Sequence, residues 1–210
     1  MERKEATKIA LELSGVKESS KIFTRLGQAE QFIREQPIYY DKAKLWWYWN
    51  KIEYRWELVD ETDILNLINH ILDIDTINSK AKTEILESLK QCSRLKKPKD
   101  IKKTWIQFHD TIFDIETGDL MTATSEYFVT NPIPYQLHPE KFEETPNIDR
   151  IFQEWVGPKH VKTLYQIISY CLIPDYPIHR IFCFIGGGMN GKSKFLDLLR
   201  KFLNRRVCNH

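Results

Sequence analysis

The range of possible folds is narrowed above all by a glycine-rich run of eight residues, Gly186-Gly187-Gly188-Met189-Asn190-Gly191-Lys192-Ser193. Glycines, which lack a Cβ, allow a turn that points successive main-chain N–H groups inward at an anion. Lys192 is a compact cation that can reach phosphate oxygens, and Ser193 offers a hydroxyl to an accompanying Mg²⁺. The run therefore predicts a P-loop, a turn that binds the phosphates of a nucleoside triphosphate.

The residues on either side of this run fit a strand, loop and helix in that order. The unbroken apolar run Ile181-Phe182-Cys183-Phe184-Ile185 predicts a strand buried on both faces, as in a parallel sheet. Residues 194–203 predict a helix whose N-terminal dipole favours an anion. Its inner face would carry Phe195, Leu198, Leu199 and Phe202.

The chain before residue 147 has a different texture. Helical spacing predicts two short helices within residues 2–35, and aromatic and β-branched runs predict a small antiparallel sheet within 38–59. A helical pair should follow Asp60, then further strands between 105 and 122, and a proline-rich connector over 131–146. Helices are expected again at 148–156 and 161–172.

These patterns predict an α+β N-terminal region of helices and small antiparallel sheets, followed by the first strand, loop and helix of an α/β P-loop domain. The expected divisions are 1–36 for the N-terminal helices, 37–146 for a mixed α+β domain, and 147–210 for the start of the P-loop domain.

Composition excludes some classes of protein. The 31 Lys and Arg residues nearly balance the 29 Asp and Glu residues, so any nucleic-acid contact must come from a local patch. The four cysteines are far apart and the histidines are not grouped with acids or cysteines, which indicates neither a zinc site nor a disulfide framework. No apolar stretch approaches the ~20 residues of a membrane span. We therefore expect a soluble, cytoplasmic protein.

Two features could contact nucleic acid. One is a basic stretch around Pro98, expected to be a surface loop that either grips a phosphate backbone or is a solvated linker. Its basic residues are Arg94, Lys96, Lys97, Lys99, Lys102 and Lys103. The other is a strand face carrying Trp47 and Trp49, which could stack on unpaired bases, although aromatic side chains in small sheets more often fill the core.

The eight-residue run, with Asn190 before Gly-Lys-Ser, resembles the Walker A element of superfamily 3 helicases of viruses and plasmids. The segments Ile112–Leu120 and Phe128–Tyr135 resemble the region before the ATPase in phage, plasmid and poxvirus-type primase-helicases. The resemblance implies a linker domain over 37–146 and an AAA+ motor, usually hexameric, that uses ATP and Mg²⁺ to move along single-stranded or forked DNA during replication. It also implies that Lys192 binds phosphates, Ser193 holds Mg²⁺, and Asn190 shapes the loop.

Only 17 residues follow Ser193, which leaves no room for an acidic Walker B pair, a sensor residue or an arginine finger. No complete catalytic site is therefore expected in these 210 residues. The chain would then be either a fragment of a longer protein or a natural short form. One alternative is a non-enzymatic DNA-binding or regulatory module with a nucleotide-binding or vestigial loop. Another is a nucleotide kinase, which is disfavoured by the long region before the loop and by Asn190.

Overall fold

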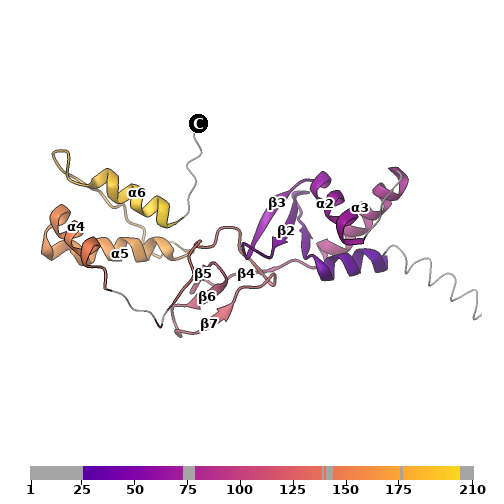
Figure 1. The fold of residues 1–210 in the computed structure, drawn as a ribbon, viewed down its shortest axis with the longest axis horizontal. Helices are drawn as coiled ribbons and strands as arrows, with labels where there is room; N and C mark the ends of the chain where they lie inside the picture. The colour runs from indigo at the N-terminus through magenta and orange to yellow at the C-terminus, as the bar shows by residue number, and fades with distance from the viewer. Residues whose placement is uncertain (1–25, 73–78, 139, 141–143, 176, 204–210) are drawn as a thin grey trace, which may run out of the picture. The chain divides into compact units, whose positions relative to one another are not determined.

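The computed structural model describes residues 26–72, 79–138, 140, 144–175 and 177–203 (Figure 1). The chain divides into two compact units, Met1–Lys99 and Asp100–His210, each with its own core. The first of the two predicted N-terminal helices lies outside the described residues. The predicted domain boundaries after residues 36 and 146, and the kinds of domain predicted on either side of them, stay predictions.

The first unit is built on a three-stranded antiparallel sheet, as predicted. Residues 26–35 are helical and lead into β1 (Ile38–Tyr40), which pairs with β2 (Trp46–Asn50), and β2 pairs with β3 (Arg55–Val59). The register sets Trp46 opposite Val59 and Trp49 opposite Trp56. The aromatic runs of the sequence are therefore these strands, because bulky rings pack well on a pleated surface.

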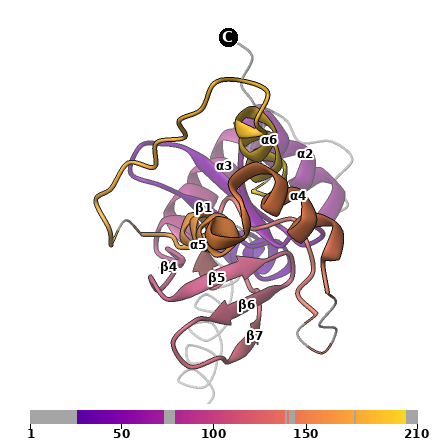
Figure 2. The ribbon, with the colours of Figure 1, turned by 90° about the vertical axis from the view of Figure 1, so that its left-hand side faces the viewer.

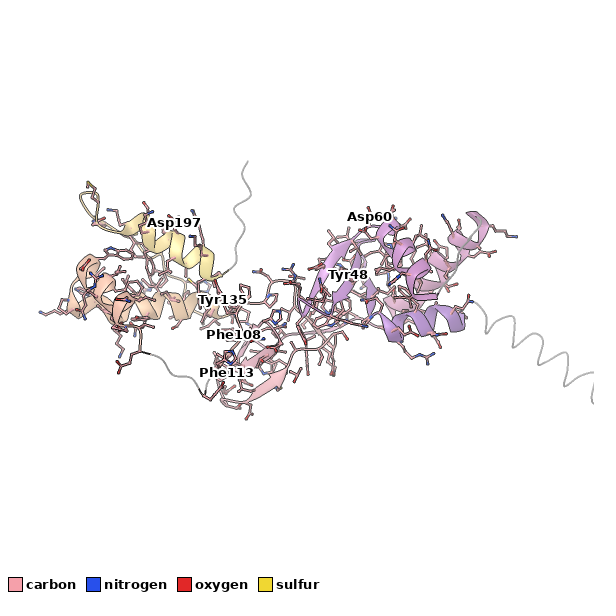
Figure 3. The ribbon with its side chains drawn as sticks, viewed as in Figure 1. Tyr48, Asp60, Phe108, Phe113, Tyr135 and Asp197 are labelled. Carbon is pink, nitrogen blue, oxygen red and sulfur yellow. The ribbon has the colours of Figure 1, made fainter. Side chains whose placement is uncertain are left out.

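Two helices complete the first unit. Helix α2 (Glu61–Leu72) starts after Asp60, which is labelled in Figure 3, and α3 runs over Ser79–Arg94. The Asp60 carboxylate accepts a 2.9 Å hydrogen bond from the Asp63 N–H, and the Asp63 carboxylate accepts one of 3.2 Å from the Asp60 N–H. This reciprocal pair satisfies N–H groups that a helix start leaves without partners, and it makes Asp60 the cap of the helix predicted to follow it.

One apolar core joins these elements. It receives side chains from the helix at 26–35, from β1 and β2, and from one face each of α2 and α3. Its fully or nearly fully buried members are Ala29, Phe32, Ile33, Ile38, Trp46, Ile64, Ile68, Ile85, Leu86 and Leu89. At the surface, the Lys90 ammonium lies 2.9 Å from a Glu61 carboxylate oxygen and links α3 to α2.

The second unit begins with another antiparallel sheet, which confirms the strands predicted between residues 105 and 122. Its order is β5 (Trp105–Phe108), β6 (Thr111–Asp114) and β7 (Leu120–Thr122). A separate two-stranded sheet pairs β4 (Lys99–Asp100) with β8 (Tyr127–Phe128).

The carboxylate of Asp114 holds the turn after β6. It accepts a 2.8 Å hydrogen bond from the Trp105 indole N–H and a 3.0 Å hydrogen bond from the Glu116 N–H. The bond from Glu116, with further help from Trp105, keeps the pKa of the buried Asp114 carboxyl below its ordinary value. Asp114 therefore has a structural part in the sheet.

The helices of the second unit follow these sheets in the chain. They include α4 (Pro146–Val156), the short 3₁₀ helix η1 (Pro158–His160), α5 (Val161–Leu172) and α6 (Lys192–Phe202). Phe152, Leu164, Ile167 and Phe195 form the core shared by the three α-helices. The Tyr165 hydroxyl donates a 2.7 Å hydrogen bond to the Asp149 carboxylate and so ties α5 to α4. Among the helices of the described residues, none has both the length and the apolar character of a membrane span.

The prediction of a buried strand at Ile181–Ile185 is wrong for this structure. The segment runs as a coil between α5 and α6 (Figure 2), and Ile181 and Ile185 are 89% and 93% exposed. Phe184 packs inward, with its ring 5.3 Å from that of Phe195, and the half-exposed Phe182 ring lies 5.9 Å from that of Tyr170. The main chain pairs with no strand of the described residues, and an apolar run alone cannot bury both of its faces.

We expect Leu89→Ala to lower the free energy of unfolding of the first unit by about 2–5 kcal/mol, because it leaves a cavity among fully buried side chains. Gln91→Ala, on the exposed side of the same helix, is the matched control and should change that free energy by less than about 0.5 kcal/mol. Urea unfolding followed by tryptophan fluorescence measures both. Equal losses from the two variants would contradict the assigned core.

We expect Asp114→Asn to lower the melting temperature of the second unit at neutral pH, because Asn keeps a single acceptor oxygen and its NH₂ group cannot accept the second of the two bonds from Trp105 and Glu116. The folded carboxyl has a depressed pKa, so its stabilisation is complete above the ordinary Asp pKa of about 3.9 and is lost as the pH falls through the folded value. The difference between wild type and variant should therefore shrink below about pH 4. Thermal melts at several pH values measure it. Glu116→Gln, which keeps the main-chain donor, should leave the melting temperature unchanged at every pH.

Candidate functional site

The glycine-rich run forms a tight loop up to Gly191, and its last two residues, Lys192 and Ser193, begin α6. Three of its residues have positive φ: Gly188 at 106°, Met189 at 49° and Gly191 at 79°. Gly191 is the left-handed residue immediately before α6. A Cβ on residue 186 in place of the glycine hydrogen would overlap the side-chain amide of Asn190. The turn therefore favours glycine at the positive-φ positions 188 and 191, whereas a side chain at position 186 would have to displace the Asn190 amide.

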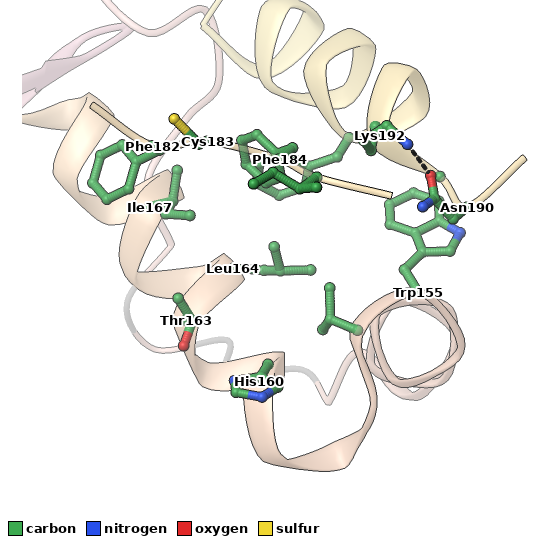
Figure 4. Close-up of a pocket in the computed structure, with 14 residues that line it drawn as sticks. Trp155, His160, Thr163, Leu164, Ile167, Phe182, Cys183, Phe184, Asn190 and Lys192 are labelled. Carbon is green, nitrogen blue, oxygen red and sulfur yellow. Dashed lines mark hydrogen bonds between the residues drawn. The ribbon is translucent and has the colours of Figure 1, made fainter. Parts of the chain in front are cut away.

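The Lys192 side chain folds back across this loop. Its ammonium donates a 3.0 Å hydrogen bond to the Gly186 carbonyl and a 2.6 Å hydrogen bond to the Asn190 side-chain carbonyl, the bond drawn in Figure 4. The positive charge is thus held at the opening of the turn, next to the N-terminus of α6. The N-terminus of an α-helix adds a partial positive charge at the same place.

Trp155 on α4 is a site residue that sequence reasoning missed. Its indole ring lies against the Cα of Gly191, so closely that a Cβ there would overlap the ring. The ring also packs on Phe152, with centroids 5.8 Å apart. Nothing in the local sequence signals this contact, because the two residues lie on different elements and no motif links them.

Two cavities meet at this loop. One, of about 420 Å³, is lined by Trp155 and by the residues from Gly188 to Lys194, including the exposed Ser193. The other, of about 540 Å³, lies between the coil 182–185 and helices α4 and α5 (Figure 4). Both are lined by Trp155, Asn190, Gly191 and Lys192.

The basic stretch around Pro98 differs from the predicted surface loop. Arg94 is the last residue of α3, and Lys99 belongs to β4, because the helix and the strand reach further into the stretch than Pro98 suggested. The six basic side chains are all exposed. The division between the two units falls directly after Lys99, so Lys102 and Lys103 belong to the second unit.

Several of these basic groups already have structural partners. The Arg94 guanidinium donates a 2.7 Å hydrogen bond to the Asp41 carbonyl and lies 4.8 Å from the centre of the Tyr40 ring. The Lys102 ammonium lies 4.7 Å from the centre of the Trp105 ring, and Lys103 forms a 2.9 Å ion pair with Asp175. Arg94 therefore helps hold α3 on the sheet of the first unit.

The tryptophans of the first sheet are mostly core residues. Trp46, Trp49 and Trp56 are only 3%, 5% and 2% exposed. Trp47 is half-buried, and its indole N–H donates a 2.9 Å hydrogen bond to the Asp41 carboxylate. Trp49 offers no face to a base in this structure, because its ring is covered and packs edge-on against Trp56. Of the two rings predicted to stack on bases, Trp47 is therefore partly accessible in this structure and Trp49 is not.

Metal-ligating side chains do not gather elsewhere in the described part of the chain, where no group of three or more His, Cys, Asp or Glu residues could hold an ion. Ser193, whose hydroxyl the sequence predicts as a Mg²⁺ ligand, lines the smaller cavity.

A comparison with models of protein families gives a match. The family model described as D5 N terminal like matches residues 29–159, which is more than half of the chain. Domains of this kind are found in D5-family primase-helicases of phages and plasmids. The matched residues include α4 with Trp155 and stop before the glycine-rich loop. A search of curated proteins finds no significant match. The chain belongs to the D5 N-terminal-like family.

Proposed function

We propose that the loop from Gly186 to Ser193 is a P-loop that binds the phosphates of ATP with Mg²⁺, and that the chain is the N-terminal-like domain and nucleotide-binding segment of a superfamily 3 DNA helicase of the primase-helicase type. The observation that carries the proposal is the position of the Lys192 ammonium, which closes the loop through Gly186 and Asn190.

The loop is shaped for an anion. Its turn contains positive-φ residues, and a Cβ would meet the Asn190 side chain at position 186 and the Trp155 ring at position 191. The ammonium of Lys192 is now bound by two uncharged acceptors. Phosphate oxygens carry full charge and make stronger hydrogen bonds with an ammonium, so they can replace those acceptors. The eleven residues of α6 place a helix N-terminus at the same point.

The residues also fit the ion that accompanies a triphosphate. Ser193 is exposed on the cavity that the loop encloses, where its hydroxyl can approach an oxygen-ligated Mg²⁺. The bound ion would neutralise phosphate charge. Lys192 would hold the β- and γ-phosphates, and Asn190 would keep the turn in shape after the lysine moves to its ligand.

Membership of the D5 N-terminal-like family supports the wider role. In a replicative helicase of this type, we expect a homo-oligomeric ring, usually a hexamer, acting on single-stranded or forked DNA. The exposed lysines around Pro98 are the candidate contacts for its phosphate backbone. A non-enzymatic DNA-binding or regulatory module with a vestigial loop is the competing outcome of the tests below.

We expect Lys192→Ala to weaken binding of ATP in the presence of Mg²⁺ by about 10- to 100-fold, because a charged hydrogen-bond donor to phosphate contributes about 1.5–3 kcal/mol. Isothermal titration calorimetry measures the affinity. Lys194→Ala is the matched control, since Lys194 is an exposed lysine two residues further along α6, and its affinity should stay within about twofold of wild type. Equally weak binding by wild type and Lys192→Ala would mean a vestigial loop.

We expect binding of single-stranded DNA to weaken when Lys96, Lys97, Lys102 and Lys103 are changed to Glu, with a salt dependence shallower by about one unit for each lost phosphate contact. Fluorescence anisotropy over a range of salt concentrations measures both quantities. The control is a variant with the same change in net charge, in which four exposed lysines elsewhere in the chain become Glu. These are Lys42, Lys44, Lys80 and Lys82 of the first unit. If both sets of changes weakened DNA binding equally, the basic stretch would be a solvated linker and not a DNA-binding site.

A further inference from the structure

The larger of the two cavities at the loop has mainly apolar walls. Its volume of about 540 Å³ is within the range of about 300–1,000 Å³ typical of small-molecule sites. The walls come from α4, α5, α6 and the coil before the loop. Their apolar side chains include Trp155, Val156, Leu164, Ile167, Phe184 and Phe195.

This cavity is continuous with the loop. Trp155, Asn190, Gly191 and Lys192 line it together with the cavity that the loop encloses. A molecule whose charged end is held by Lys192 therefore has an apolar recess directly beside that end. The uncharged part of the same molecule can then occupy the recess while the charged end stays bound to Lys192. This favours a single ligand that fills both cavities over a separate partner in the recess.

The chemistry of the walls suits a nucleobase. A base is a flat aromatic ring that binds well against aromatic and aliphatic surfaces, and it carries polar groups at its edge. Figure 4 shows Thr163 and His160 at the side of the cavity away from Lys192. These two side chains offer a hydroxyl and an imidazole to the edge of a base, whereas the middle of the cavity is apolar around Leu164.

We propose that this cavity receives the nucleoside part of the triphosphate, and that Trp155 is the positioning residue that joins the base recess to the phosphate loop. The inference rests on the proposed phosphate binding. Trp155 would act on both parts of the ligand, because its ring lies against Gly191 and the residue also lines the recess.

The test compares ATP with inorganic tripolyphosphate, which has no nucleoside, both with Mg²⁺ and the full 210-residue chain in a calorimeter. We expect wild type to bind ATP at least about tenfold more tightly than tripolyphosphate, since stacking and burial of a base are lost with the second ligand. Thr163→Phe fills the recess from an exposed position of α5. It should abolish this preference and leave the affinity for tripolyphosphate within about threefold of wild type.

Gln166→Phe is the matched control, because Gln166 is a neutral, exposed residue of α5 that does not line the cavity. It should keep the preference for ATP. Trp155→Ala should lose the preference and Trp155→Phe should keep part of it. Retained binding of tripolyphosphate by Trp155→Ala shows that its loop is folded, and if that variant binds neither ligand, Thr163→Phe decides.

Three outcomes would overturn the proposal. Equal affinities of wild type for ATP and tripolyphosphate, with both dependent on Lys192, would exclude the base recess and leave the phosphate loop in place. An unchanged preference in Thr163→Phe would place the base elsewhere. Binding of neither ligand by wild type would remove the proposed function and this inference with it.

Discussion

The position of the glycine-rich loop depends on the contact between the Trp155 ring and the Cα of Gly191. Gly191 must have positive φ to turn the chain into α6, and it must lack a Cβ to let the ring approach, so two separate requirements fall on one residue. The contact sets the N-terminus of α6 against α4, where Phe195 meets Phe152 at 5.9 Å. The loop, its lysine and both adjoining cavities follow from that arrangement.

Much of the fold is predictable because its signals are local. The Asp60 cap, the aromatic strands around Trp46 and the helix after Gly191 each depend on residues only a few positions apart. The glycines and Lys192 of the candidate site can also be predicted from the sequence, because the conformational freedom of glycine and the charge of lysine are properties of the residues themselves.

The features that escaped prediction depend on distant partners. An apolar run such as Ile181–Ile185 becomes a buried strand only where other strands lie on either side of it, which its own sequence cannot specify. Alternation along β2 separates two faces but does not say which is covered, and Trp49 proves to be buried like Trp46 on the opposite face. Trp155 reaches the loop only through the packing of α4 on α6.

Trp155 also connects two parts of the chain that sequence comparison treats separately. The family match ends at residue 159, before the loop, yet it contains α4 and therefore the ring that supports Gly191. A close-packed contact of this kind cannot stretch, so any ligand that lifts the loop must either break it or carry α4 along. The hydrogen bond between Tyr165 and Asp149 ties α5 to α4, so a shift of the loop would move both helices. Of these two helices, α4 lies within the residues matched by the family model and α5 lies beyond them.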